Sequence, residues 1–241
     1  MNLILKMAWL NSWRNKRRTA VLLCAMVVGL VGVLFTAAFM QGWLDEMVNV
    51  AIRSSGGHVK IMRRAYHENP VIEHAMREDA ELIESLRSDA RIADVRSRLT
   101  AGGLLSNARH SAAVRLVGID PDAEPLRALL GEAVDLEGRF LDSSEPLGAL
   151  VGRKLVEKME TGLGRKVVMM GQHGSGDLAS GAFRVAGIYD SGNSSADERT
   201  VYVLKSQLQD VVGLDGRVTE LGVRLRDRDA SALVAADVNA R

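Results

Sequence analysis

One long apolar segment dominates the pattern of hydrophobic and polar positions along this chain. Residues 20–40 carry no charge, and Thr36 is their only polar side chain. A helix of this length would measure about 31 Å, close to the thickness of the hydrocarbon core of a bilayer. The pattern therefore predicts a transmembrane helix, which we place at residues 20–43.

After this segment, short alternating or apolar runs that are typical of strands mix with runs of helical period. Strands are predicted at residues 58–62, 95–105, 112–119, 148–151, 167–170, 183–189, 201–204 and 221–225. Helices are predicted at residues 72–86, 125–130, 153–159, 206–212 and from 230 onward. The prediction is an α+β fold, with one N-terminal transmembrane helix and a larger folded region.

Glycines mark the expected loops. Gly162 or Gly164 is expected to end the helix at residues 153–159. Residues 171–181 are expected to form a glycine-rich polar turn, and residues 192–196 a surface turn with no helix after it.

The charges that flank the apolar segment are asymmetric. Five basic residues and no acidic residue precede it, namely Lys6, Arg14, Lys16, Arg17 and Arg18. Asp45 and Glu46 follow it. The positive-inside rule therefore places the N-terminus in the cytoplasm and the rest of the chain outside it. Trp9 and Trp13 are expected at one membrane interface and Trp43 at the other.

Two features concern the membrane helix and its entry. Residues 1–19 are expected to form a cytoplasmic amphipathic elbow, although a plain basic flank explains the same residues equally well. Small residues recur inside the span and predict packing against another helix; they are Ala25, Gly29, Gly32 and Thr36. A cleaved signal peptide ending near residues 36–38, or a buried helix of a soluble protein, are the less favoured readings.

Composition limits the function of the outer region. The first 18 residues hold five positive charges, which leaves 26 basic and 30 acidic residues, a net charge of −4, in the remainder. That balance argues against a nucleic-acid partner. Cys24 is the single cysteine of the chain and lies in the apolar segment, so the outer region contains no internal disulfide.

No motif in the sequence predicts catalysis. A phosphate-binding loop is missing, and residues 162–164 lack the third glycine of a dinucleotide fingerprint. Residues 192–196 only resemble a nucleophile elbow. His67 and His74 could share a helix face, yet no metal motif includes them. We therefore expect no catalytic, cofactor-binding or metal-binding residue, and no cofactor.

Several segments together resemble the N-terminal part of ABC transporter permeases of the MacB and lipoprotein-release family. They are AWLNSWRNKRRT (8–19), GHVKI (57–61), VGIDP (117–121) with Glu124, LVGRKL (150–155), the Gly164 turn with VV (167–168), VAGIY (185–189) and VTEL (218–221). Arg165 and Tyr189 depart from the family pattern, where an acid and Phe are common.

The resemblance implies an outer, periplasmic core domain at residues 44–241 with two subdomains. Residues 44–119 and 216–241 would be Porter-like, and residues 120–215 a Sabre-like insertion. Because three further membrane helices are expected after such a domain, the chain is expected to be C-terminally incomplete.

The resemblance also implies the partners and the location. They are an ABC ATPase subunit, a second permease subunit in a homo- or heterodimer, the lipid bilayer of the inner membrane, and a lipoprotein or other extracytoplasmic substrate. The expected function is mechanotransmission for lipoprotein release, without enzymatic activity in this chain. The alternatives are drug or peptide efflux of the MacB type, or a single-pass membrane-anchored sensor or binding domain.

Overall fold

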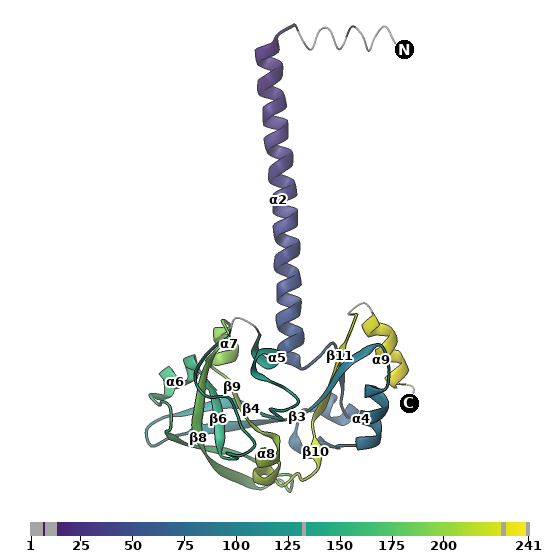
Figure 1. Ribbon diagram of the computed structural model, residues 1–241. Helices are drawn as coiled ribbons and strands as arrows, with labels where there is room; N and C mark the ends of the chain where they lie inside the picture. The colour runs from purple at the N-terminus through teal and green to yellow at the C-terminus, as the bar shows by residue number, and fades with distance from the viewer. Residues whose placement is uncertain (1–6, 8–13, 132–133, 228–229, 240–241) are drawn as a thin grey trace. The chain divides into compact units, whose positions relative to one another are not determined.

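The computed structural model describes Met7 and residues 14–131, 134–227 and 230–239 (Figure 1). The chain divides into two compact units, residues 1–50 and residues 51–241. We call the second one the folded unit. Most of the expected amphipathic elbow, with Trp9 and Trp13, lies outside the described residues.

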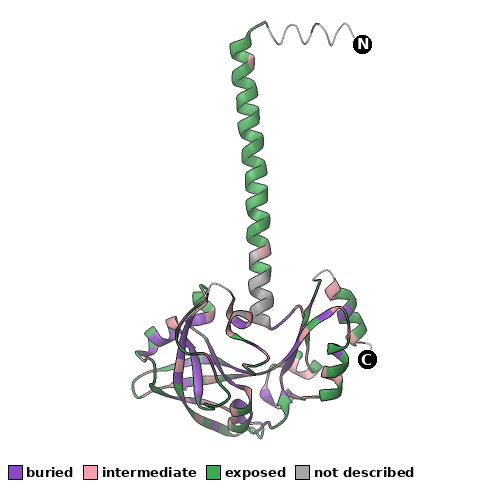
Figure 2. Ribbon diagram, in the orientation of Figure 1, coloured by how far each residue is buried: buried purple, intermediate pink, exposed green. Residues whose placement is uncertain are grey.

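Helix α2 (Lys16–Ser55) contains the predicted span. Within its section Lys16–Asp45, the most apolar window of 18 residues has a mean hydropathy of 2.6 and none of that window is buried, as Figure 2 shows by the exposed colour of the helix. This section is long and apolar enough to cross a bilayer. The prediction of an N-terminal apolar helix is confirmed, and the helix continues beyond both predicted ends until Gly56, whose φ of +86° ends it.

The folded unit is built on one large sheet with the strand order β1-β11-β3-β4-β9-β6-β8-β5, in which β7 pairs with β3 and β8. Its strands are β1 (Val59–Ile61), β3 (Ile92–Ser106), β4 (Ser111–Ile119), β5 (Asp135–Gly138), β6 (Gly148–Gly152), β7 (Lys166–Gln172), β8 (Leu178–Asp190), β9 (Thr200–Leu204) and β11 (Glu220–Leu225). A separate two-stranded sheet joins β2 (Met76–Arg77) to β10 (Arg217–Val218).

Short helices connect the strands. They are α3 (Arg64–Glu68), the 3₁₀ helix η1 (Ile72–His74), α4 (Ala80–Arg87), α5 (Leu126–Leu130), α6 (Arg153–Met159), α7 (Ser194–Asp197), α8 (Lys205–Val212) and α9 (Ser231–Asn239). The α+β class predicted from the sequence is therefore confirmed.

Strand β3 connects two hydrophobic cores. Its residues 92–98 pair with β11, whereas residues 99–106 pair with β4. One core contains Leu86, Val95 and Val223, and the larger one contains Leu99 and Leu105 together with side chains of α6, α8 and β6 to β9. Because β3 belongs to both cores, its midpoint is where the two parts of the folded unit meet.

Several local predictions agree with the structure. The strands predicted at residues 95–105 and 112–119 are present as β3 and β4. They form a hairpin, and in its turn the Asn107 carboxamide oxygen accepts the backbone N–H groups of Arg109 and His110. Helix α6 has the predicted bounds. The strands β1, β6, β8, β9 and β11 and the helices α5, α8 and α9 also lie where they were predicted, within a few residues.

The prediction of a helix over residues 72–86 was wrong in its first half. Only α4 is helical, and it begins where the Asp79 carboxylate accepts the N–H groups of Glu81 and Leu82 at 2.9 and 3.3 Å. Residues 72–77 instead form η1 and β2, because β2 pairs with β10, which lies about 140 positions later in the chain.

Two further loop predictions were wrong, and one was correct only in its centre. Helix α6 ends at Glu160, which has a φ of 47°, before either glycine named for this role. The turn predicted at residues 171–181 is shorter, residues 173–177, because β7 reaches Gln172 and β8 begins at Leu178, with Gly171 opposite Ala179. The segment 192–196 starts helix α7, since the Asn193 side chain accepts the N–H of Ala196.

Candidate functional site

Two arginines of β3 lie inside the folded unit. Arg96 and Arg98 are two positions apart in a strand, so their side chains leave the same face. Only 8% of one and 3% of the other is exposed. Both bind the carboxylate of Glu124, which is 2% exposed: Arg96 Nη1 donates at 3.1 Å and Arg98 Nε at 3.0 Å. Arg98 Nη2 donates as well, and Arg96 Nε donates to Asp94 at 2.8 Å. We call these four residues the junction cluster.

A tight turn after β4 places the side chain of Glu124 against β3. Its backbone N–H donates to the carbonyl oxygen of Asp120 at 2.8 Å, and Asp120 also accepts the N–H of Asp122 through its side chain at 3.1 Å. The turn joins β4 to α5 and brings the carboxylate back across the strand that precedes β4. The cluster therefore ties this turn to the strand that both cores share.

The two glycines after α2 lie against the same part of the sheet. A Cβ at Gly56 would be 3.0 Å from Cζ of Arg98, and a Cβ at Gly222 would be 2.3 Å from the carbonyl oxygen of Gly56. A Cβ at Gly57 would be 2.6 Å from the carbonyl oxygen of Val223. Only glycine fits this close approach of backbones, so Gly56 and Gly57 lie directly against β11 and the junction cluster.

Ser97, between the two arginines, belongs to a second polar group. Lys205 Nζ donates to Glu78 Oε1 and to Ser97 Oγ, both at 2.8 Å. The Ser97 hydroxyl also donates to Glu78. A cavity of about 90 Å³ is lined by residues of both polar groups, including Arg96 and Glu124. The start of α8 is thereby connected to the segment that precedes α4.

Burial keeps the tyrosines of this region protonated. It raises the pKa of Tyr202 to about 12, although the nearby Arg98 acts in the opposite direction. Burial also raises the pKa of Tyr66, against a hydrogen bond with Thr219 that lowers it. The Tyr189 hydroxyl donates to the carbonyl oxygen of Thr200 at 3.0 Å. These phenols act as hydrogen-bond donors at neutral pH and not as bases.

The chemistry of the junction cluster is structural. Its two cations and two anions bind each other, which leaves no free nucleophile or base among them. Within the residues that the structure describes, no three His, Cys, Asp or Glu side chains are placed to share a metal ion. Buried, mutually paired charges hold one arrangement of their strands and turns, because breaking such a pair costs about 3 to 5 kcal/mol.

The residues predicted to set membrane topology lie in α2 or next to it. Arg14 precedes the helix, and Lys16, Arg17 and Arg18 form its first turn with exposed side chains. Trp43 is 54% exposed in the same helix. Their role at the membrane interfaces stays a prediction.

The predicted packing face of the membrane helix is exposed in the single chain. A Cβ at Gly29 or Gly32 would meet no atom within 4 Å, and Ala25 is also exposed. The Thr36 hydroxyl donates to the carbonyl oxygen of Gly32 at 2.8 Å. The face is therefore free to receive another helix, and its use stays a prediction.

Reasoning from the sequence missed the junction cluster. Glu124 was noticed only as part of a family-like segment, and Arg96 and Arg98 were read as ordinary positions of an alternating strand. The available signal was two arginines, two positions apart, flanked by Val95 and Leu99. Where such a pair is buried, its charges require an acidic partner.

Comparison with known proteins gives a family. Residues 19–241 match the family model described as MacB-like periplasmic core domain. The extracellular domain of the noncanonic ABC-type transporter YknZ from Gram-positive bacteria is 16% identical, covering 75% of this chain and 93% of that chain, with a TM-score of 0.48. The periplasmic region of MacB from Actinobacillus actinomycetemcomitans is 16% identical. The match covers 74% of this chain and 78% of that chain, with a TM-score of 0.48. The comparison with curated protein sequences found no match.

Proposed function

Because this chain belongs to the MacB-like periplasmic core domain family and is an ABC transporter permease of the MacB type, we propose that it couples ATP hydrolysis to substrate movement outside the cytoplasm. A partner ATPase subunit would hydrolyse the ATP, and a second permease subunit would complete the membrane part. The observation that carries this proposal is the family match, which includes the apolar helix and the folded unit in one continuous stretch.

The apolar helix anchors the chain in a membrane, and the proposed orientation follows from its charges. Arg14, Lys16, Arg17 and Arg18 support a cytoplasmic N-terminus in the inner membrane. The folded unit would then be periplasmic. Within it, we propose a Porter-like part at residues 44–119 and 216–241 and a Sabre-like part at residues 120–215, with β3 reaching into both.

We propose a lipoprotein as the substrate, and release from the membrane as the step that the folded unit performs. The family resemblance of the sequence supports this choice. The junction cluster supports the mechanical side of the proposal, since it connects the residues after α2 to the strand that both cores share. No bond of the substrate needs to be broken by this chain.

The direct connection between α2 and the sheet can be tested by lengthening it. A short Gly-Ser linker inserted between Ser55 and Gly56 should abolish substrate release while the partner ATPase stays active. A matched insertion between Ser143 and Ser144, which lie in an exposed loop, should leave release unchanged. Release of a lipidated protein from proteoliposomes is the measurement. Full release with the first insertion would refute coupling through this connection.

Two further observations test the wider proposal. Copurification of this protein with an ATPase encoded next to its gene is expected, whereas a chain that binds no ATPase would be a membrane-anchored sensor or binding domain. Topology reporters placed after Trp43 should be active on the periplasmic side. Activity in the cytoplasm would contradict the proposed orientation.

A further inference from the structure

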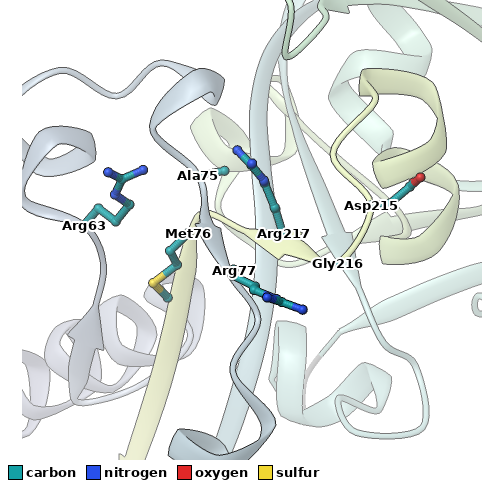
Figure 3. Close-up of a pocket in the computed structure, with 7 residues that line it drawn as sticks. All are labelled: Arg63, Ala75, Met76, Arg77, Asp215, Gly216 and Arg217. Atoms are coloured by element: carbon teal, nitrogen blue, oxygen red, sulfur yellow. The ribbon is translucent and has the colours of Figure 1, made fainter.

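Three arginines surround a recess on the folded unit. Arg77 of β2 and Arg217 of β10 are directly opposite each other in the two-stranded sheet. Arg63, just before α3, is the third arginine of the recess. Figure 3 shows that the three side chains come from separate segments and that their guanidinium groups point in different directions.

Several other arginines of the described chain are paired with acids. Arg64, Arg91, Arg96, Arg98, Arg139 and Arg153 each bind acidic side chains. Across the described residues, by contrast, no carboxylate forms an ion pair with the three arginines of the recess. Like charges at directly opposite positions of two strands are destabilising. An anion that binds between them would remove this repulsion.

The recess has the size and the charge of a ligand site. Its volume is about 690 Å³, within the range of small-molecule pockets. Three positive charges and the single negative charge of Asp215 line it, so its lining is positive overall and attracts an anion.

The backbone that carries the recess is held in place. The carbonyl oxygen of Gly216 accepts the N–H of Glu78 at 2.9 Å. The carbonyl oxygen of Arg217 accepts from the Gln209 side chain at 2.8 Å, and Gln209 is buried. A fixed backbone presents the arginines without a large ordering cost on binding.

We propose that this recess binds a small ligand with at least two oxyanion groups, either carboxylates or phosphates. The guanidinium group presents its N–H donors as a fork that matches both kinds of oxyanion. Because the three guanidinium groups point in different directions, one isolated oxyanion cannot engage all of them. The inference rests on the recess alone and does not depend on the transport function proposed above.

Binding can be measured by titration calorimetry with the full chain in nanodiscs of zwitterionic lipid, at low salt. The probes are citrate and pyrophosphate, with acetate as the probe that has a single oxyanion group. We expect citrate or pyrophosphate to bind at least about tenfold more tightly than acetate. Whichever of citrate and pyrophosphate binds more tightly identifies the ligand as a carboxylate or a phosphate. Binding of neither probe overturns the proposal.

Variants locate the binding. Arg77→Gln and Arg217→Gln should each weaken it by about 10- to 100-fold, whereas Arg109→Gln, in the exposed turn between β3 and β4, should not change it. Asp215→Asn should strengthen binding about threefold, because it removes a like charge from the wall. That gain could not result from a folding defect. Wild-type affinity in Arg217→Gln, or an equal loss in Arg109→Gln, would overturn the proposal.

Discussion

Replacing Glu124 by Gln tests the junction cluster directly. The side chain keeps its shape and one acceptor oxygen, but the negative charge between Arg96 and Arg98 is lost. Asp94 would remain as the only anion of the cluster, and it touches Arg96 alone, with 28% of its side chain exposed. The buried guanidinium of Arg98 would therefore lose the charge of the Glu124 carboxylate.

The expected loss of unfolding free energy is about 3 to 5 kcal/mol, the range for removing one partner from a buried ion pair. The total unfolding free energy of a natural domain is about 5 to 15 kcal/mol. With a denaturant slope of about 2 kcal/mol per molar urea, the unfolding midpoint should fall by about 2 M. This variant is therefore expected to bring the folded unit close to its limit of stability.

The chain contains a matched control for this measurement. Glu145 forms an ion pair with Arg139 at the surface, where 48% and 62% of the two side chains are exposed. Glu145→Gln should cost less than about 1 kcal/mol. All three tryptophans precede the folded unit, so unfolding in urea should be followed by circular dichroism. If Glu124→Gln costs no more than Glu145→Gln, the buried charges do not hold the junction.

The same variant shows whether the end of α2 is coupled to the cluster. Gly56→Ala is strained by its φ of +86° and by its contact with the Arg98 guanidinium. Replacing Glu124 by Gln removes the carboxylate that holds the Arg98 guanidinium in this position, so the second substitution should cost less than it does alone. A double-mutant cycle should give a coupling free energy of about 0.5 to 3 kcal/mol. Additive effects would mean that Gly56 and the cluster are independent.

Two more predictions concern the folded unit. Gly152→Ala should lower the unfolding free energy by about 3 kcal/mol, because a Cβ there would lie 2.0 Å from a backbone oxygen of α7. Gly162→Ala should be nearly neutral, because a Cβ there would meet no atom within 4 Å. Equal effects of the two substitutions in urea unfolding would refute the packing argument. Burial raises the pKa of Asp197, and the N–H and O–H of Ser191 oppose that rise. The folded state therefore holds this proton more tightly than the unfolded state does, so the stabilisation is complete below the unfolded pKa and is lost as the pH rises through the folded pKa. Relative to Asp197→Asn, the wild type should gain stability between about pH 7 and about pH 4, and a constant difference across that range would contradict this reasoning.

The parts of the fold that were predicted correctly are those whose signal is local. The hairpin of β3 and β4 needs only alternation and a turn that Asn107 can stabilise, and both lie within about 25 residues. Helix α6 follows a buried strand and ends near glycines, so the helical spacing of its apolar residues is enough to predict its bounds. The prediction of a helix over residues 72–86 was wrong in its first half because that segment contains β2, which pairs with β10. No local pattern reveals this distant partner.

The candidate site could not be predicted for the same reason. Arg98 and Glu124 are 26 positions apart, and a turn whose path depends on Asp120 brings them together. In the sequence, both residues look like solvent-exposed charges of a strand and a loop. Gly56 and Gly57 were visible as a break after the apolar helix, but their contact with β11 is a property of the folded sheet.

The position of the buried charges in the fold has its own physical consequence. A slip by two positions keeps every side chain of a strand on the same face, so alternation alone does not exclude such a slip of β3. Arg96 and Arg98 must meet one carboxylate, and any slip would leave at least one charge unpaired in the interior. The cluster therefore specifies one register at the point along β3 where its pairing partner changes from β11 to β4. Gly56 lies against Arg98 at that same point. A displacement of the chain at Gly56 must consequently either move β3 as a body or break the pairing, and the cost of breaking it favours moving the strand.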